Sequence, residues 1–321
     1  QRWQAAGFSP RVDIADELSQ GTFHPFSGQA AALNLVPPGH TLEHWTRYGS
    51  EAGGQDIKDT WEPARFAWSL DLAAANLHSL DGRYAACFWN SVETFLAANP
   101  VDTGPNWSSA QEIALRAIYW IISLGVIGND PASSPARMTR ITQAIFQHAQ
   151  RLPLTLNYAR SQNNNHVLSE SLGLIFAGEY LAGVTPQAQR WISRGEQEFE
   201  RALLQQIDDQ GNYSQHSAIY HRMMLQLALL YEVRNRRIKR EIPASVSRKL
   251  ELATRWLTAQ LDPLSGRLPN LGHNDGTLLL PFGSEEYRDM RPTAQAASLA
   301  FCGTNCLSPG NWDELSTWLG L

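Results

Sequence analysis

The chain has 321 residues, of which 43% are apolar, and a formal net charge of −5 at pH 7. This length fits two ordinary domains or one large repetitive domain, and the apolar fraction is ample for a hydrophobic core. A nucleic-acid-binding protein is not expected, because such surfaces need a basic excess or clustered Lys and Arg.

Cysteine and tryptophan content adds two constraints. The three cysteines, Cys87, Cys302 and Cys306, form no zinc-binding signature. Cys302 and Cys306 are close enough in sequence to pair, which would leave one thiol over, so the redox compartment stays open. The eleven tryptophans suit the apolar faces of sugar rings, although most of them are expected to fill the core.

The N-terminal segment, residues 1–60, is expected to be irregular and to wrap the outside or rim of the domain that follows. Pro37-Pro38-Gly39 and Gly53-Gly54 interrupt any regular element there. No signal peptide is visible at Gln1. Either a leader was removed or none existed, so a periplasmic or secreted location is expected, with the cytoplasm as the alternative.

Residues 61–321 predict a succession of helices of two kinds. Helices that are apolar nearly all round alternate with helices that carry one apolar stripe, as inner and outer layers do. The apolar helices are expected over 107–124, 166–181 and 220–231. The striped helices are expected over 135–150, 186–207 and 243–257.

This alternation, at a period of about 50 residues, describes stacked helical hairpins. It predicts an all-α fold, a complete or incomplete (α/α)5–6 toroid, with an open solenoid as the alternative. The ring is favoured because polar groups precede or begin successive inner helices. Ser109 and Glu112 predict a capping box on the first of these helices. The apolar stretch 113–127 contains Arg116 and is too short to cross a bilayer comfortably, so no membrane span is expected.

The first polar cluster is the run Gln162-Asn163-Asn164-Asn165-His166, which opens an apolar helix. Buried amides need hydrogen-bond partners, and each one left unpaired costs roughly 1–3 kcal/mol. A ligand rich in hydroxyls and carboxylates would supply such partners. Glu170 follows His166 by one helical turn, so it could hold one tautomer of the imidazole. A lone histidine at a helix start is more often structural, and the three asparagines shift the interpretation toward function.

Three further polar segments are candidates. The run from Tyr213 to Arg222 contains Tyr220 and His221 and begins the next apolar helix. The turn 269–276 contains His273 and could cross the mouth of a central cup, although a tight Gly-Asp turn explains it equally well. The segment 56–65 carries three charges and a tryptophan, and a simple helix start with a surface salt bridge would account for it. Asn106 could simply cap its helix.

Five motifs then occur in a fixed order: Asp56-x-Lys58…Trp61-Glu62-x-x-Arg65, Asn106-Trp107…Arg116, Asn163-x-Asn165-His166…Glu170-x-x-Gly173, Tyr213…Ser217-x-x-Tyr220-His221 and Pro269-Asn270-x-Gly272. Together they resemble the N-terminal domain of the heparinase II/III and oligo-alginate lyase families of polysaccharide lyases, over nearly all of the chain from about Asp56. The resemblance implies an (α/α) toroid followed by β-sandwich domains. The sandwich, which in the family adds a catalytic residue and often a metal, is expected to be absent from this chain, so no cofactor is expected in this domain.

The resemblance also implies a mechanism. Such lyases remove the C5 proton of a uronate, break the C4–O bond and leave an unsaturated sugar. By resemblance, Asn165 neutralises the uronate carboxylate, His166 assists it or acts as a base, and Tyr220 is the base or the acid. Positive charge from His221 or Arg222 is expected to lower the pKa of Tyr220. The residues expected to bind substrate are Arg65, Asn106, Trp107, Asn163, Glu170, His221, Arg222 and His273. His273 stands where the family turn carries an acid, so that contact departs from the pattern.

Two other functions remain open at this point. A glycoside hydrolase on the same fold would need two carboxylates roughly 5–10 Å apart, such as Glu170 with Asp56 or Asp275. A non-catalytic protein that binds acidic glycans or serves polysaccharide assembly would keep the cup without the chemistry. The expected partner in each case is a polysaccharide or oligosaccharide. Few Lys and Arg fall in the predicted cup, which favours a carboxylate-only polymer such as alginate over a heavily sulfated glycosaminoglycan.

Overall fold

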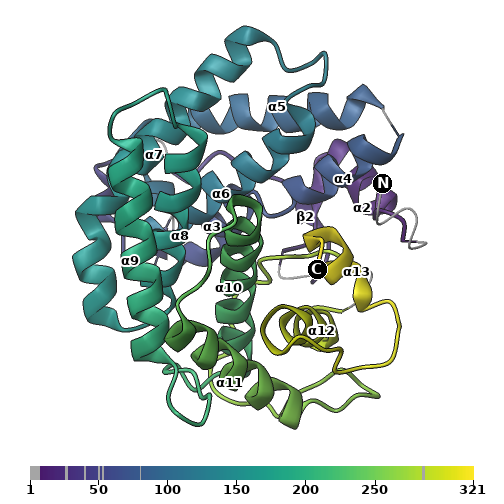
Figure 1. Cartoon of the computed structure of the whole chain (residues 1–321). Coiled ribbons are helices and arrows are strands. Elements are labelled where there is room, and N and C mark those ends of the chain that lie inside the picture. Colours follow the sequence, from purple (N-terminus) through teal and green to yellow (C-terminus); the bar gives the residue numbers. More distant parts are fainter. Residues whose placement is uncertain are drawn as a thin grey trace. The chain divides into compact units, whose positions relative to one another are not determined.

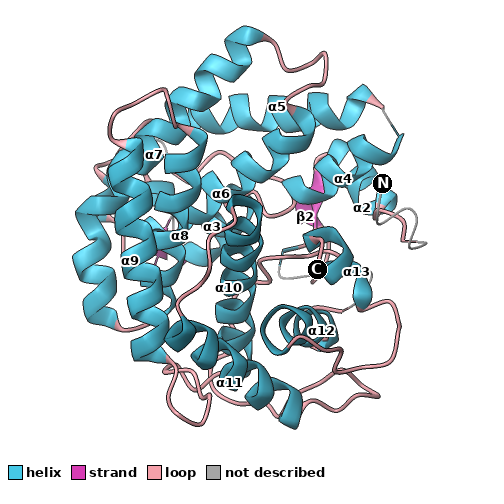
Figure 2. Cartoon of the chain, viewed as in Figure 1, coloured by secondary structure: helices cyan, strands magenta, loops and turns pink. Residues whose placement is uncertain are grey.

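The computed structural model describes residues 8–25, 28–39, 41–49, 51–52, 54–79, 81–283 and 286–321. Helices dominate the described chain, and the strands are short (Figure 2). The chain divides into two compact units. The N-terminal unit comprises Pro10–Tyr158 and Ser169–Glu196, and the C-terminal unit comprises Gln1–Ser9, Ala159–Leu168 and Gln197–Leu321.

The first part of the N-terminal unit is less irregular than expected. It begins with helix α2 (Val12–Ser19), whose buried residues Ala15 and Leu18 form its inner face. Two small antiparallel sheets follow, and a 3-10 turn, η2, lies between them. Their bounds are β1 (Thr22–Phe23), β2 (Ala31–Ala32), η2 (Trp45–Arg47), β3 (Glu51–Ala52) and β4 (Gln55–Asp56). Thr22 pairs with Ala32, and Glu51 pairs with Asp56. The boundary predicted at residue 60 and the wrapping role of this segment stay predictions.

The helices of the N-terminal unit pack around an aromatic core. They are α3 (Ile57–Ala64), α4 (Ser69–Ser79), α5 (Gly82–Ala98), the 3-10 turn η3 (Pro105–Trp107), α6 (Ala110–Ile127) and most of α7 (Pro135–Gln162) (Figure 1). Phe66, Phe95 and Trp120 meet edge to face, with ring centroids 5.4–5.7 Å apart. Removing each such side chain from water contributes about 1.5–3 kcal/mol. This core fixes the residues that precede α6.

Helix α6 is buried on most sides, as its sequence predicted. The predicted capping box is wrong: the Ser109 hydroxyl makes no capping hydrogen bond, and the Glu112 carboxylate binds Arg65. At 18 residues α6 is longer than the predicted 15-residue stretch, and it is the one helix of the described chain long and apolar enough to cross a membrane. Its window is 72% buried inside the protein, as in the core helix of a globular fold.

The striped helix predicted over 135–150 continues to Gln162 in the structure. Pro153 lies inside it, where a proline removes one helical hydrogen bond without always ending the helix. The next helix, α8 (Asn165–Tyr180), approaches α6 closely. A Cβ added at Gly173 would lie 2.6 Å from the Cβ of Ala114, so only glycine permits this packing distance.

The C-terminal unit is built around α10 (Ala218–Ile238), which is buried nearly all round. It packs on α11 (Ala244–Gln260), whose predicted apolar stripe is confirmed. The stripe residues Val246, Leu250, Ala253 and Leu257 are all buried. Part of α9 (Ala188–Gln206), helix α12 (Arg291–Ala297), the π turn Ser298–Cys302 and α13 (Asp313–Leu319) complete this unit. Residues 261–290 contain no helix among those described, so the regular hairpin pattern stops at α11. The three cysteines are free thiols.

Candidate functional site

The first polar cluster forms a sharp turn between α7 and α8. Asn163 has a φ of +49°, a left-handed conformation that asparagine tolerates better than most residues. The side chain of Asn164 accepts a hydrogen bond from the backbone N–H of His166 at 3.0 Å and caps α8. The asparagine run therefore serves the turn and the helix start, and it leaves His166 half-buried at the first turn.

The structure brings the first polar cluster against the second one within the C-terminal unit. The backbone N–H of Asn165 donates to the Gln215 amide oxygen at 3.0 Å, and the Ser214 hydroxyl donates to the Asn163 carbonyl at 3.2 Å. Gln206 donates to the Asn164 carbonyl at 3.0 Å. Two polar segments that lie about 50 residues apart in the sequence thus form one site.

The side-chain amide of Asn165 lies beside the first turns of α10. Its nitrogen is 3.5 Å from the sulfur of Met223, and Asn165 is only 3% exposed. Met223 follows Tyr220 by three residues, so the two side chains share one face of α10. The contact consequently places the amide near the Tyr220 side of that helix. The catalytic roles predicted for the two residues stay predictions.

Tyr220 itself stands on a capped helix start. The Ser217 hydroxyl accepts the backbone N–H of Tyr220 at 3.2 Å, and it donates to the His273 carbonyl at 2.5 Å. The Tyr220 phenol donates to the Asp275 carboxylate at 3.1 Å. The negatively charged carboxylate accepts a hydrogen bond from the neutral phenol, whereas it would repel a phenolate. This contact therefore favours the protonated form of Tyr220.

The turn 269–276 is held against the start of α10. The Ala218 N–H donates to the Leu271 carbonyl at 3.1 Å. Gly272 has a φ of +67°, and a Cβ there would lie 2.4 Å from the His216 carbonyl oxygen, so this approach requires glycine. The side chains of His273 and Asp275 are exposed. Contact between this turn and the start of α10 is therefore built into the C-terminal unit, and the prediction that the turn crosses the mouth of a cup stays a prediction.

His221 and Arg222 point into the protein. His221 Nε2–H donates to the Ala253 carbonyl at 2.9 Å, and the ring stacks on Trp256 at 4.5 Å. Burial lowers the pKa of His221 to about 4, so the ring is neutral at pH 7 and supplies no positive charge to Tyr220. Burial also lowers the pKa of Arg222, whose guanidinium binds the Tyr287 carbonyl and lies 4.5 Å from the ring centroid of that residue. The role predicted for both residues in binding substrate stays a prediction.

In the N-terminal unit, Arg65 forms a buried ion-pair network. It is 5% exposed and contacts Glu112 at 2.7 Å, as well as Glu62. The alternative interpretation of a surface salt bridge is therefore wrong. The two carboxylates raise the pKa of Arg65 further above its ordinary value against the effect of burial, so the guanidinium stays charged.

Asn106 and Trp107 belong to a second buried network in the same unit. The Asn106 amide donates to Asn99 at 2.8 Å, and its carbonyl accepts from Arg116 at 2.9 Å. Arg116 also donates to the His148 ring at 2.9 Å, which requires a neutral imidazole acceptor. Burial and the neighbouring Arg116 lower the pKa of His148 accordingly. Trp107 is 2% exposed and packs on the same histidine, at 4.8 Å.

Glu170 lies in a third buried cluster of this unit. Thr155 donates to its carboxylate at 3.2 Å. Burial raises the pKa of Glu170 to about 8, and the Thr155 hydrogen bond and nearby Arg151 oppose that shift. Arg151 lies 3.8 Å from the ring centroid of Trp45 and 3.8 Å from Asp102, and its guanidinium nitrogens have no hydrogen-bond partner within the described residues.

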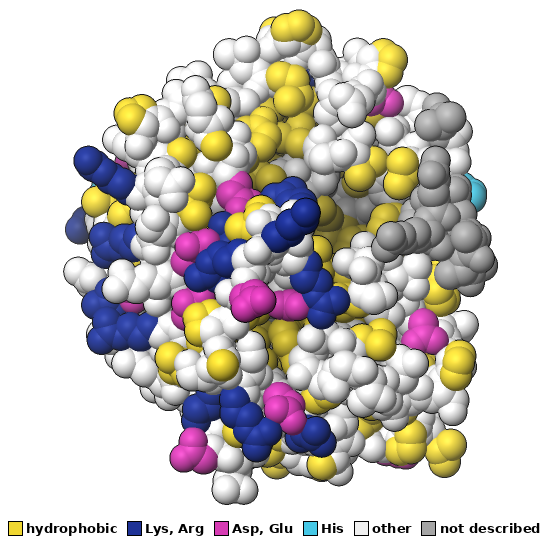
Figure 3. Space-filling model, viewed as in Figure 1, with side chains coloured by type: hydrophobic (Ala, Val, Ile, Leu, Met, Phe, Trp, Pro, Cys, Tyr) yellow, Lys and Arg dark blue, Asp and Glu magenta, His cyan; other side chains and the backbone are white. Residues whose placement is uncertain are grey.

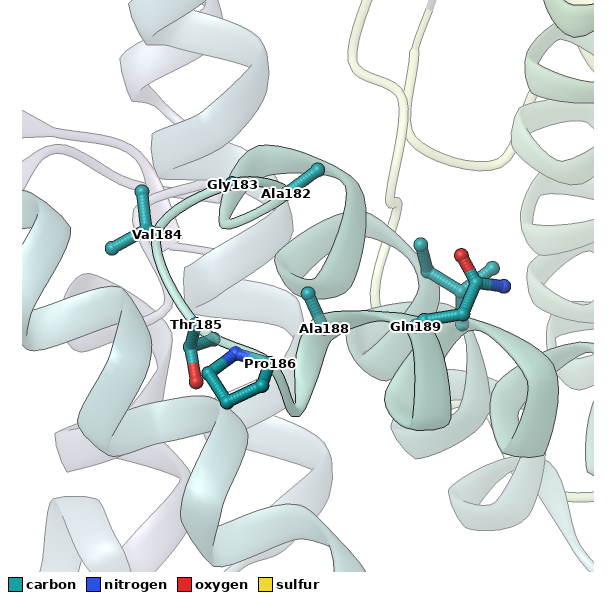
Figure 4. Close-up of a pocket in the computed structure, with 8 residues that line it drawn as sticks. Ala182, Gly183, Val184, Thr185, Pro186, Ala188 and Gln189 are labelled. Carbon is teal, nitrogen blue, oxygen red and sulfur yellow. The ribbon is translucent and has the colours of Figure 1, made fainter.

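A pocket of about 390 Å³ lies in the α8–α9 turn of the N-terminal unit (Figure 4). Its lining is mainly aliphatic, with Thr185 and Gln189 as the polar members. Neither side chain is an acid or a base at neutral pH, so this pocket is no candidate for the chemistry above. Within the described residues, no group of three or more His, Cys, Asp and Glu is placed to hold a metal ion.

The sequence analysis did not predict which side chains meet Asn165 and Tyr220, although it named Asp275 as a possible hydrolase carboxylate. Gln215 and Met223 contact Asn165, and Asp275 contacts Tyr220. Asp275 was visible as part of a polar turn, but only the fold shows which side chain it meets. Met223 gave no signal, because a methionine on an apolar helix is indistinguishable from core.

The sequence profile of the heparinase II/III N-terminus family matches residues 42–276, which is more than two thirds of the chain. The chain belongs to this family. The matched span contains every residue that the sequence analysis placed in the site. No curated protein sequence matches the chain.

Solved structures of heparinases share the fold of this family member. A structure of heparinase III superposes with a TM-score of 0.63 at 15% identity, covering 91% of this chain and 45% of the other. The heparan sulfate lyase HepC from Pedobacter heparinus gives a TM-score of 0.57 at 18% identity, covering 84% of this chain and 44% of the other. The predicted fold class, an all-α toroid of helical hairpins, is confirmed by this likeness. The chain spans less than half the length of these structures.

Proposed function

We propose that this member of the heparinase II/III family acts in a polysaccharide lyase that cleaves a uronic-acid-containing glycan by β-elimination. The observation that carries the proposal is the meeting of Asn165 and the Tyr220 turn of α10 in one polar cluster. An almost buried amide donor and a phenol hydrogen-bonded to Asp275, both beside the start of α10, match two of the three tasks of this reaction. The family and the names of the similar structures support the class of reaction.

The first task is to stabilise charge at the uronate. Removing the C5 proton places negative charge on the adjacent carboxylate, which becomes enolate-like. In the proposed mechanism the Asn165 amide donates to that group, and it is held in place before the substrate arrives. One such preorganised donor is worth about 2.7–4 kcal/mol of barrier in other enzymes.

The second and third tasks are proton transfers. The proposed base is His166, half-buried at the start of α8. It takes the C5 proton, the electron pair forms the C4=C5 double bond, and the C4–O bond breaks. Tyr220 then gives its phenolic proton to the departing oxygen, since its contact with Asp275 keeps the phenol protonated. Water later returns a proton to Tyr220 and removes one from His166.

The test follows ultraviolet absorbance of the new C4=C5 bond with heparan sulfate, hyaluronan and alginate as substrates. It uses the 321-residue chain and the longest form of the protein that its source produces. We expect absorbance to rise with at least one glycan and to vanish in Tyr220→Phe, which removes only the hydroxyl. Asn165→Ala should lower the rate by roughly 10²–10³-fold.

A second candidate function is non-catalytic binding of an acidic glycan. Retained glycan binding without any new absorbance in either form of the protein would select this function and exclude the lyase.

A further inference from the structure

A groove of about 790 Å³ lies at the far end of α10 from Tyr220, within the C-terminal unit. The end of α10, the start of α11 and Phe301 form it. Its charged lining residues are Glu232, Arg236, Lys239, Arg240, Glu241, Arg248 and Glu251. Basic and acidic side chains are interleaved over this end of α10 in the space-filling view (Figure 3).

The sequence around this groove is basic although the chain is acidic. Residues 232–255 contain eight Lys and Arg against three Glu, whereas the remainder has 18 Lys and Arg against 28 Asp and Glu. Segments of this kind are typical of surfaces that bind polyanions, and the groove lining itself carries four of these Lys and Arg against the three Glu. The expectation that the chain has no clustered Lys and Arg is therefore wrong at this one place.

Two of the groove arginines are held by acidic neighbours on their own helix. Arg236 contacts Glu232 at 2.5 Å, and Arg248 contacts Glu251 at 2.8 Å. A guanidinium carries five N–H donors, and one carboxylate uses only part of them. Each pair therefore fixes the direction of an arginine and leaves donors for an oxyanion.

A third groove arginine is anchored on a different helix. Arg240 contacts Glu200 at 2.8 Å and the Tyr231 hydroxyl at 2.9 Å. Because this anchor comes from α9, the arginine cannot swing away with the α10–α11 turn alone. The groove thus presents oriented cations instead of flexible surface chains.

Lys239 is the cation of the groove whose ammonium has no ion-pair or hydrogen-bond partner within the described part of the chain. It occupies the C-cap of α10 with a φ of +57°, a conformation in which most side chains are strained. An asparagine or glycine would serve that backbone better.

A simpler explanation is that these cations only offset the negative end of the α10 macrodipole. That effect needs one or two charges in the last turn and is worth about 0.3–1 kcal/mol. It does not require a hollow of this size, and pockets of roughly 300–1,000 Å³ are typical of ligand sites. Ile242 and Phe301 add apolar surface to the lining, which suits the faces of sugar rings.

We infer that this groove binds the oxyanion groups of an acidic glycan at a site separate from Tyr220. Helix α10 has 21 residues, so the two ends lie ~30 Å apart along the helix. A long chain could occupy both places, whereas a short oligosaccharide could not. The choice of a glycan as the ligand rests on the proposed function. The inference that the groove binds oxyanions does not rest on it.

The test measures binding of two size-defined decasaccharides, one from heparin and one from hyaluronan, by titration calorimetry. The groove variant is Lys239→Asn with Arg248→Gln, because asparagine accepts the left-handed backbone and the Arg248 side chain is 61% exposed. The matched control is Arg267→Gln with Arg288→Gln, which removes two exposed cations of the same unit that do not line the groove. Folding is checked by circular dichroism in each case.

We expect the groove variant to weaken binding of at least one decasaccharide by about five-fold or more, and the control to change it less than two-fold. Equal loss in both variants would show a diffuse charge effect and overturn the inference, as would no loss in either. If single-stranded DNA or anionic vesicles displace the glycan at equal charge concentration, the groove is a general polyanion site, and the assignment of a glycan as its ligand is overturned. The same titration in Tyr220→Phe keeps the two proposals apart: groove binding persists there even if no lyase activity exists.

Discussion

The polar residues of the two units differ in what surrounds them. In the C-terminal unit, His166 and Tyr220 are half-buried and stand at helix starts whose backbone groups are already satisfied. In the N-terminal unit, Arg65 and Arg116 are almost completely buried, and their hydrogen bonds go to other protein groups. Both kinds of residue occur in the family motifs. The comparison teaches that motif residues can be enclosed in the frame of the fold in one unit and stay partly accessible at helix starts in the other.

The strongest test of this comparison removes the charge at the centre of the N-terminal frame. Arg65→Leu should lower the free energy of unfolding by roughly 3–5 kcal/mol, because the buried Glu112 and the mostly enclosed Glu62 lose their cation. Denaturant unfolding followed by circular dichroism measures it. Arg65→Leu combined with Glu112→Leu should recover part of the loss, and a failure to recover any would contradict the ion-pair explanation.

The next test uses the pH dependence of stability in the N-terminal unit. Burial raises the pKa of Glu170 to about 8 from an ordinary 4.5, so the folded protein holds a proton that the unfolded chain has lost at pH 7. Stability from this group is therefore complete below pH 4.5 and decreases as pH rises toward 8. The loss between pH 4.5 and 7 is about 3 kcal/mol. Glu170→Gln should flatten this slope in denaturant unfolding, and an unchanged slope would refute the assignment.

The C-terminal unit should show the opposite slope. Burial lowers the pKa of His221 to about 4 from an ordinary 6.5, so on acidification the unfolded chain takes up a proton before the folded protein does. Stability from this group is complete above pH 6.5 and decreases as pH falls toward 4, by about 3 kcal/mol in total. His221→Phe keeps a ring to stack on Trp256 and should remove this dependence. Thermal unfolding from pH 4 to 7 checks it, with exposed His78→Phe as the control.

The fold was predictable from sequence where burial follows a helical period. Helix α11 shows this most clearly, since its four stripe residues are all buried. The length of α7 was not predictable, because Pro153 marks a possible helix end and only tertiary packing carries the helix past it. Gly173 shows a third case. Its place in a family motif was visible in the sequence, but the need for glycine there, which comes from close packing on Ala114, was not.

The candidate site divides in the same way. The asparagine run and Tyr220 stood out in the sequence because polar side chains at the start of apolar helices are costly without partners. Their partners did not stand out, because Asp275 and Met223 reach the site only through long-range contacts. The helical period of apolar residues shows which face of a helix is buried. It does not show which side chain from a distant part of the sequence contacts that helix.

The smallest expected effect sharpens the comparison most, because it separates stability from chemistry at one atom. Ser217→Ala removes a helix cap and the bond to the His273 carbonyl, so unfolding should cost about 1 kcal/mol less. The same change releases the turn that delivers Asp275 to Tyr220. If the proposed mechanism holds, lyase activity should fall by more than the small stability loss explains, with the protein still folded at the assay temperature. Ser245→Ala, a change at an exposed position near the start of α11 that does not line the groove, is the matched control and should leave both quantities unchanged. Equal activity in the two variants would assign Ser217 to the frame of the fold instead of to the site.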